Sequence, residues 1–118
     1  MAIRHARPGQ IVHLLASDGT LPTPQSFALF KSDQLELLRL VLPRGKSFPS
    51  HRVAGEITMQ VLEGRVEIDV GGIPQILGPG QLMHLEGDVD HSLRGVEDAS
   101  VLVTIVLVRG SEGVRSPT

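Results

Sequence analysis

Short apolar runs, repeatedly interrupted by glycine and proline, are the feature that most limits how this chain can fold. Thirteen glycines and eight prolines divide the sequence, and no stretch sustains the three-to-four-residue spacing of an amphipathic helix. The runs are rich in Val, Leu and Ile, which favour strands. The predicted strands cover residues 10–15, 26–30, 34–42, 56–62, 65–70, 73–77, 81–85 and 101–108. Many short strands joined by Gly/Pro turns predict an all-β fold, a small antiparallel β-barrel or sandwich.

The length of 118 residues suits a single domain, which we expect to span residues 1–118, with a core at about 10–108 and a frayed tail at 109–118. Eleven basic and thirteen acidic side chains nearly cancel, so the chain lacks the basic excess that nucleic-acid binding needs. No apolar run is long enough to cross a bilayer. Cysteine is absent, which excludes disulfides and thiolate metal sites. We therefore expect a cytoplasmic protein with neither nucleic acid nor membrane as a partner.

Two of the predicted strands carry apolar residues on both faces. They cover residues 35–42 and 101–108, and the second contains only Thr104 as a polar residue. A strand in a small barrel buries one face in the interior, so an apolar second face needs another cover. That cover is either the N-terminal segment or a second copy of the chain. We favour the second copy, and so expect a homodimer.

Two glycine–histidine patterns give the chain a family resemblance. In the first, Gly45, His51 and Gly64 stand in the register of the first cupin motif. The second pattern, over residues 77–93, contains His91 where the second cupin motif has its metal-binding histidine. The chain thus resembles a small, single-domain, RmlC-like cupin. This resemblance implies a barrel of the double-stranded β-helix, or jelly-roll, type.

The resemblance also implies a metal site, although the metal motif is degenerate. Where the family pattern has its second histidine, this chain has Val53, and where the pattern has its glutamate, this chain has Ile57. Only His51 and His91 then remain as ligands. A first-row ion normally takes at least three protein ligands and keeps open positions for substrate.

Three residues are weaker candidates for the third ligand: Glu56, Gln60 and His84. Strand alternation turns Glu56 and Gln60 outward if Ile57 faces inward, and it places His84 outward as well. A bulge at residues 54–55 would bring Glu56 inward. A completed site would hold one divalent ion such as iron, manganese, nickel or zinc.

The expected site is the mouth of the barrel. Its predicted lining residues are His51, Val53, Ile57, Met59, Val61 and His91. In the first hypothesis, this apolar pocket binds a small-molecule ligand without a full metal site, as a binding module or as a metal-free enzyme such as an isomerase. The two histidines would then orient a polar group or move a proton.

The alternative hypothesis is the metal-dependent cupin enzyme, of dioxygenase or decarboxylase type, that the resemblance implies. It would use His51, His91 and a third ligand, and the ion would polarise the substrate or activate oxygen. A third interpretation is a filled barrel that serves only through its dimer surface. The sequence leaves open whether the protein is an enzyme.

Overall fold

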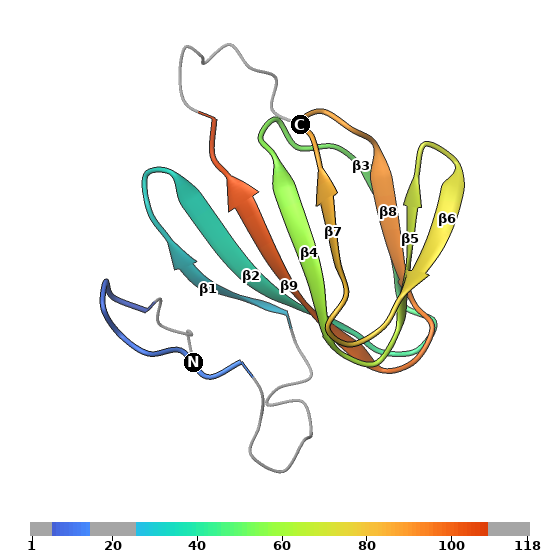
Figure 1. Cartoon of the computed structure of the whole chain (residues 1–118), viewed down its shortest axis with the longest axis horizontal. Helices are drawn as coiled ribbons and strands as arrows, with labels where there is room; N and C mark the ends of the chain where they lie inside the picture. Colours follow the sequence, from blue (N-terminus) through green and yellow to red (C-terminus); the bar gives the residue numbers. More distant parts are fainter. Residues whose placement is uncertain (1–5, 15–25, 109–118) are drawn as a thin grey trace.

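Nine strands and no helix make up the part of the chain that the structure, a computed structural model, describes: residues 6–14 and 26–108. The strands are β1 (Phe27–Lys31), β2 (Leu35–Leu42), β3 (Ser47–His51), β4 (Ile57–Glu63), β5 (Val66–Val70), β6 (Ile73–Leu77), β7 (Leu82–Leu85), β8 (His91–Gly95) and β9 (Ala99–Val106). All neighbouring strands are antiparallel (Figure 1). The all-β fold predicted from the sequence is confirmed. The predicted tail at 109–118 lies outside the described residues.

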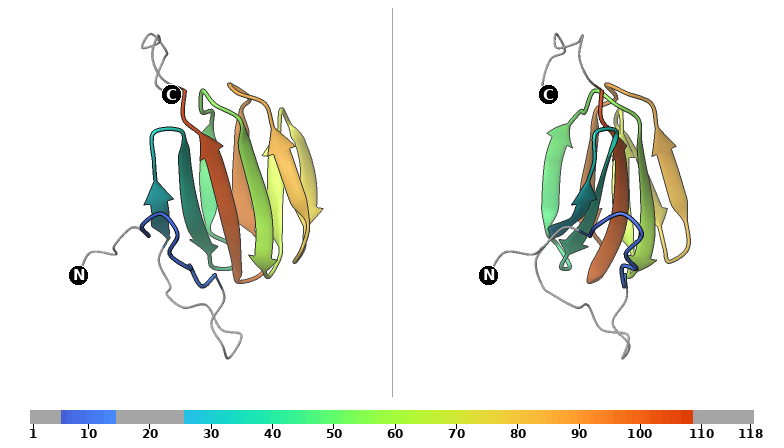
Figure 2. Two further views of the ribbon diagram at one scale, coloured as in Figure 1. Left: turned by 60° about the vertical axis from the view of Figure 1, so that its left-hand side comes forward. Right: turned by 90° about the vertical axis from the view of Figure 1, so that its left-hand side faces the viewer.

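Two sheets face each other across the interior (Figure 2). The five-stranded sheet has the order β1-β2-β9-β4-β7, and the four-stranded sheet has the order β3-β8-β5-β6. The longest pairing joins β2 to β9 without a break, from Leu35 opposite Val106 to Leu42 opposite Ala99. The chain crosses between the sheets repeatedly, so residues far apart in sequence meet in the interior.

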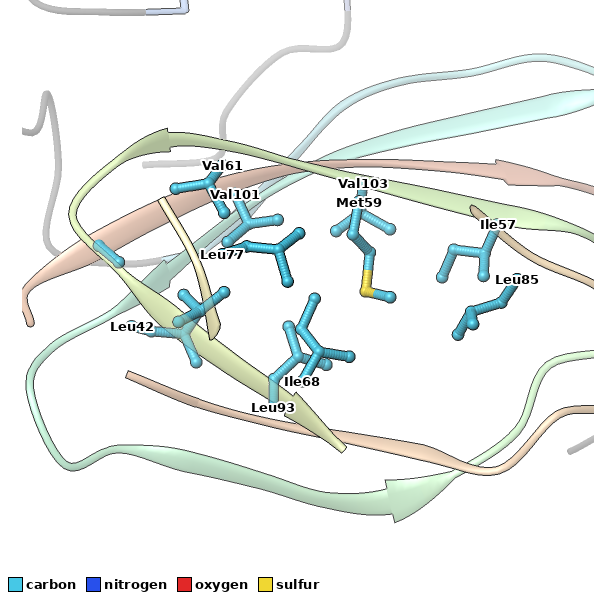
Figure 3. Packing of buried hydrophobic residues seen from close by; sticks show 12 residues of the cluster. Leu42, Ile57, Met59, Val61, Ile68, Leu77, Leu85, Leu93, Val101 and Val103 are labelled. Atoms are coloured by element: carbon cyan, nitrogen blue, oxygen red, sulfur yellow. The ribbon is translucent and has the colours of Figure 1, made fainter. Parts of the chain in front are cut away.

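Alternation along each strand selects the side chains that fill this interior. In β4, Ile57, Met59 and Val61 are buried, whereas the residues between them are only half-buried. In β5, Val66 and Ile68 are fully buried in the same way. Figure 3 shows side chains from both sheets packed against one another in the core. Burial of this apolar surface is the main stabilising contribution to the fold.

Two observed strands were missed in the sequence, and one predicted strand is wrong. Strand β3 contains Pro49, and β8 places Ser92 and Arg94 between its inward residues, so neither forms a continuous apolar run. Each is a strand because it pairs with an interior neighbour rather than because of its own propensity. Residues 10–14 of the predicted first strand are irregular, and residue 15 lies outside the described part. In that segment the Ala6 amide donates a hydrogen bond to the Leu29 carbonyl beside β1.

Both edges of the four-stranded sheet carry a proline. Strand β3 contains Pro49 and β6 contains Pro74, and each strand has a neighbour on one side only. Proline has no amide hydrogen, so it is tolerated in an edge strand whose amide side faces solvent. Strand β6 is also the strand whose apolar residues are most exposed, with Ile73 at 66% and Ile76 at 50%.

Candidate functional site

A cavity of about 300 Å³ lies between the two sheets. Strands β2, β4 and β9 supply one wall, and β3 and β8 supply the other. The lining residues are Leu38, Leu40, Phe48, Pro49, His51, Val53, Ile57, Met59, His91, Leu93, Val103 and Ile105. Ten of these twelve residues are apolar and two are histidines. The cavity is therefore an apolar chamber with imidazoles as its ionisable groups.

The two histidines meet because β3 and β8 are paired. His51 lies directly opposite His91 in this pairing, after an irregularity in β3 that follows Phe48. Their ring centroids are 4.7 Å apart and their planes are inclined by 49°. His91 is buried, whereas His51 is exposed. His51 is thus the solvent-exposed histidine of the cavity lining, and His91 is the buried one.

Backbone contact fixes the proton on His91. Its Nδ1 lies 3.1 Å from the carbonyl oxygen of Val89, and a carbonyl oxygen only accepts, so Nδ1 carries the hydrogen. Burial lowers the pKa of His91 because it removes solvent from the charged form. The nearby His51 lowers this pKa further, and the hydrogen bond to Val89 and the charge of Asp90 oppose the shift. The ring is therefore a neutral imidazole whose Nε2 is the free acceptor.

Five of the six residues predicted to line the pocket surround this cavity: His51, Val53, Ile57, Met59 and His91. The sixth, Val61, is fully buried in the core cluster and does not line the cavity. In Figure 3, Val61 and Val101 lie at one end of the core, and Ile57 lies at the other end. Val61 therefore shares a face with the site but fills the opposite end of the interior.

The three candidates for a third ligand lie on the other side of the five-stranded sheet. Glu56 and His84 are exposed, and Glu56 Oε1 is 2.8 Å from His84 Nε2. Gln60 stands between the inward-facing Met59 and Val61 and is paired with Leu82 and Leu102. Residues 54–55 therefore do not turn Glu56 into the cavity.

A polar and tightly packed rim borders the cavity beside Val53. The Asp88 amide donates a hydrogen bond to the Val53 carbonyl at 2.7 Å. Gly87 lies against the Ala54 carbonyl so closely that an added Cβ would come within 2.1 Å of its oxygen. Further out, Arg52 Nε donates to Asp90 Oδ1 at 3.1 Å, and both of these side chains are exposed. A hydrogen bond, a close backbone contact and an ion pair thus join loops 52–56 and 86–90, and these contacts keep Val53 at the cavity.

A comparison of sequences with family profiles identifies the chain. The profile of the Cupin domain family matches residues 38–108, which is more than half of the chain. The protein is a cupin. The match begins in β2 and runs through β9, so it includes every strand that lines the cavity. The resemblance seen in the two glycine–histidine patterns is confirmed.

Solved structures agree on the cupin fold. A conserved protein of unknown function from Streptococcus pyogenes superposes with a TM-score of 0.73 at 18% identity, covering 93% of this chain and 97% of that one. A cupin superfamily protein from Desulfitobacterium hafniense gives 0.69 at 17% identity, with 84% and 100% covered. KdgF from a Halomonas species gives 0.65 at 18% identity, with 73% and 80% covered. No curated protein matches the sequence significantly. At such low sequence identities, structural similarity establishes only the fold.

At the four positions of the cupin metal motif, this chain has two residues that can bind a metal and two that cannot. His51, Val53, Ile57 and His91 converge on one cavity, but two of the four have aliphatic side chains. Within residues 6–14 and 26–108, no three histidine or acidic side chains are grouped so that they could hold an ion. Two imidazoles fall short of the three ligands that a resident first-row ion normally needs. The residues present therefore do not fit the metal centre that the resemblance implies.

Seven lining residues of this cupin were not singled out from the sequence: Leu38, Leu40, Phe48, Pro49, Leu93, Val103 and Ile105. The signal for Leu38 and Leu40 was their alternation along a strand with two apolar faces, which did not reveal which face was inward. Val103 and Ile105 share that ambiguity.

Among the described residues, no helix is long and apolar enough to span a membrane.

Proposed function

We propose that this cupin binds a small, mostly apolar molecule in the cavity between its sheets, and that His51 and His91 hold the polar group of that molecule. The observation that supports this is the cavity itself, which has about 300 Å³ of space, an apolar lining and two imidazoles in contact at one side. Ligand sites of small molecules have this composition, in which apolar walls supply affinity and a few polar groups supply orientation.

The cavity volume sets the size of the ligand. An apolar cavity of about 150 Å³ is enough to hold one benzene molecule, and this cavity has about twice that volume. One or two fused rings, or an aliphatic molecule of similar bulk, therefore fit. The same two histidines could move a proton on such a molecule, so a metal-free isomerase would use the same site.

Naphthalene is a suitable first probe, because its fluorescence can be excited without background from a protein that has no Trp and no Tyr. We expect saturable binding to the wild type. Val53→Phe puts a ring into the cavity and should weaken binding at least tenfold. Val106→Phe makes the same change on an exposed residue outside the cavity and should leave binding intact. Equal affinity in Val53→Phe and the wild type would contradict the proposal.

Metal analysis tests the alternative, a metal-dependent enzyme of dioxygenase or decarboxylase type. We expect that untagged protein, analysed by plasma mass spectrometry after gel filtration, carries no stoichiometric iron, manganese, nickel or zinc. About one ion per chain in the wild type, lost in His51→Ala, would replace the proposal with the metal enzyme. His84→Ala is the matched control, because His84 lies outside the cavity.

A further inference from the structure

The hydrogen bonding of His91 determines which polar group this residue can hold in the cavity. Its Nδ1–H is already donated to the Val89 carbonyl at 3.1 Å. His91 lines the cavity, and with Nδ1 engaged the only ring nitrogen that it has left for a ligand is Nε2, which carries a lone pair. A lone pair accepts a hydrogen bond and cannot donate one, so the complementary group on a ligand is an O–H or N–H.

The charges around the cavity argue against an anionic ligand. Among the described residues that line the cavity, none is Lys or Arg. The cation nearest in sequence to His51 is Arg52, and its guanidinium is already paired with Asp90, with contacts of 3.1 and 3.4 Å. A carboxylate placed in this chamber would lose its hydration against walls that are apolar apart from two imidazoles, which is costly. A sugar would likewise bury several hydroxyl groups against walls that offer two polar side chains.

From this geometry we infer the ligand class: a neutral molecule of one or two rings, or equivalent aliphatic bulk, that carries a hydroxyl or comparable donor and directs it to Nε2 of His91. This inference rests on the proposed function and makes it more specific. The exposed ring of His51 lies beside that of His91 at the polar side of the site, with the ring centroids 4.7 Å apart. The remaining walls hold the apolar body of the ligand.

Three probes with the same rings separate the possible polar groups. 2-Naphthol carries a donor, 2-methoxynaphthalene carries only an acceptor, and 2-naphthoate carries a negative charge. Near neutral pH, we expect 2-naphthol to bind the wild type about three- to tenfold more tightly than 2-methoxynaphthalene, the gain of one hydrogen bond. We expect 2-naphthoate to bind most weakly of the three.

The outcomes distinguish this inference from the proposed function. Equal binding of 2-naphthol and 2-methoxynaphthalene, both lost in Val53→Phe, would overturn the donor inference and leave the apolar site standing. Tightest binding of 2-naphthoate would overturn it as well, because the site would then select an anion. No binding of any probe, with naphthalene also failing to bind, would remove the proposed function itself.

A variant and a spectroscopic measurement test whether His91 causes the preference for 2-naphthol over 2-methoxynaphthalene. In His91→Leu, the ratio of the two affinities should fall to about one, whereas His84→Leu, a histidine change on the outer face, should keep the wild-type ratio. Should His91→Leu not fold, long-range ¹H–¹⁵N spectra of the wild type give the answer. They should show the Nδ1–H tautomer of His91 and an Nε2 resonance that moves with 2-naphthol but not with 2-methoxynaphthalene. An unmoved Nε2 resonance at saturating 2-naphthol would overturn the inference.

Discussion

At the scale of single residues, burial makes His91 sensitive to pH. Its pKa lies below the ordinary value of 6.5 because its charged form is desolvated. Well above pH 6.5 the imidazole is neutral in both the folded and the unfolded chain and contributes no pH dependence. Below 6.5 the unfolded chain takes up a proton that the folded chain resists, so the free energy of unfolding falls until the folded pKa is reached.

The corresponding prediction is a loss of stability on acidification that depends on His91. The groups that act on its charge are His51 on β3, which disfavours protonation, and Asp90, which favours it. Urea unfolding of the wild type between about pH 7.5 and 5 should show a contribution of at most about 1.4 kcal/mol per pH unit from this proton. His91→Gln should flatten the dependence, and His84→Gln should not. Identical profiles for the wild type and His91→Gln would contradict the prediction.

Arg39 is a second residue whose burial has a measurable consequence. It lies on the outer face of β2, fully buried, with Nη2 3.3 Å from Ser100 Oγ, and its Nε has no hydrogen-bond partner among the residues that the structure describes. Desolvation lowers its pKa, and the negative charge of Glu63 opposes this. Replacing a poorly paired buried charge by an apolar side chain is often neutral or stabilising.

We therefore expect Arg39→Met to keep the free energy of unfolding or to raise it by about 1–2 kcal/mol. Arg94→Met is the control, because Arg94 is an exposed residue paired with Glu67, and it should cost no more than about 1 kcal/mol. Chemical denaturation of the three proteins gives the comparison. A loss well above 2 kcal/mol in Arg39→Met would show that the guanidinium has a stronger partner than Ser100.

At the scale of elements, the turns of the barrel differ in how much space surrounds their glycines. Gly64 joins β4 to β5 with φ at +75°, and an added Cβ would meet the Asp98 carbonyl oxygen at 2.1 Å. Gly71 joins β5 to β6 with φ at +61°, and nothing lies within 4 Å of its added Cβ. Both turns need a left-handed residue, but only the first is also crowded by neighbouring backbone.

Alanine at each position should separate these two effects. Gly71→Ala should cost about 1–2 kcal/mol, the price of the left-handed conformation. Gly64→Ala should cost markedly more, because the Asp98 backbone must also move. Thermal or urea unfolding of both variants measures the difference. Equal losses would show that the 98–99 backbone yields freely to the new side chain.

The elements also show how much of the fold could be predicted from sequence. Apolar runs predicted β2, β4 and β5 to within one residue at each end and β9 to within two, because each strand buries a continuous or alternating face. Strand β3 and the strand that begins at His91 could not be found this way, because proline and polar residues interrupt them and neighbouring strands hold them in place.

The site shows the same limit. His51, His91 and the aliphatic Val53 and Ile57 were identified by motif spacing, and the structure brings them to one cavity. Leu38 on β2 and Phe48 on β3 could not be assigned, because their place depends on which strands pair and which face turns inward. Spacing along a motif is local, whereas strand pairing is not.

At the scale of the whole molecule, two apolar side chains on the outer face of the five-stranded sheet are exposed. Leu82 is 59% exposed and Val106 is 43% exposed, and both alternate with residues that face inward, Met83 and Ile105. A second copy that docked on this face would bury both side chains. The homodimer expected from the two-sided strands remains a prediction, and this face is where we expect it.

Gel filtration with light scattering tests this expectation. The wild type should elute with the mass of a dimer at micromolar concentration, and Val106→Glu should shift it toward the monomer by burying a charge in the interface. Ile73→Glu is the control, because Ile73 is exposed on the other sheet and should leave the mass unchanged. A monomeric wild type would contradict the prediction, and an unchanged Val106→Glu dimer would place the interface elsewhere.

The prolines at the two edges of the four-stranded sheet bear on what happens when many copies are crowded together. A fibril lengthens by docking strand upon strand onto a free edge, and each new strand needs a regular ladder of amide donors. Pro49 on β3 and Pro74 on β6 interrupt that ladder at both ends of the sheet. The exposed isoleucines of β6 can therefore stand in solvent without serving as a template for open-ended growth.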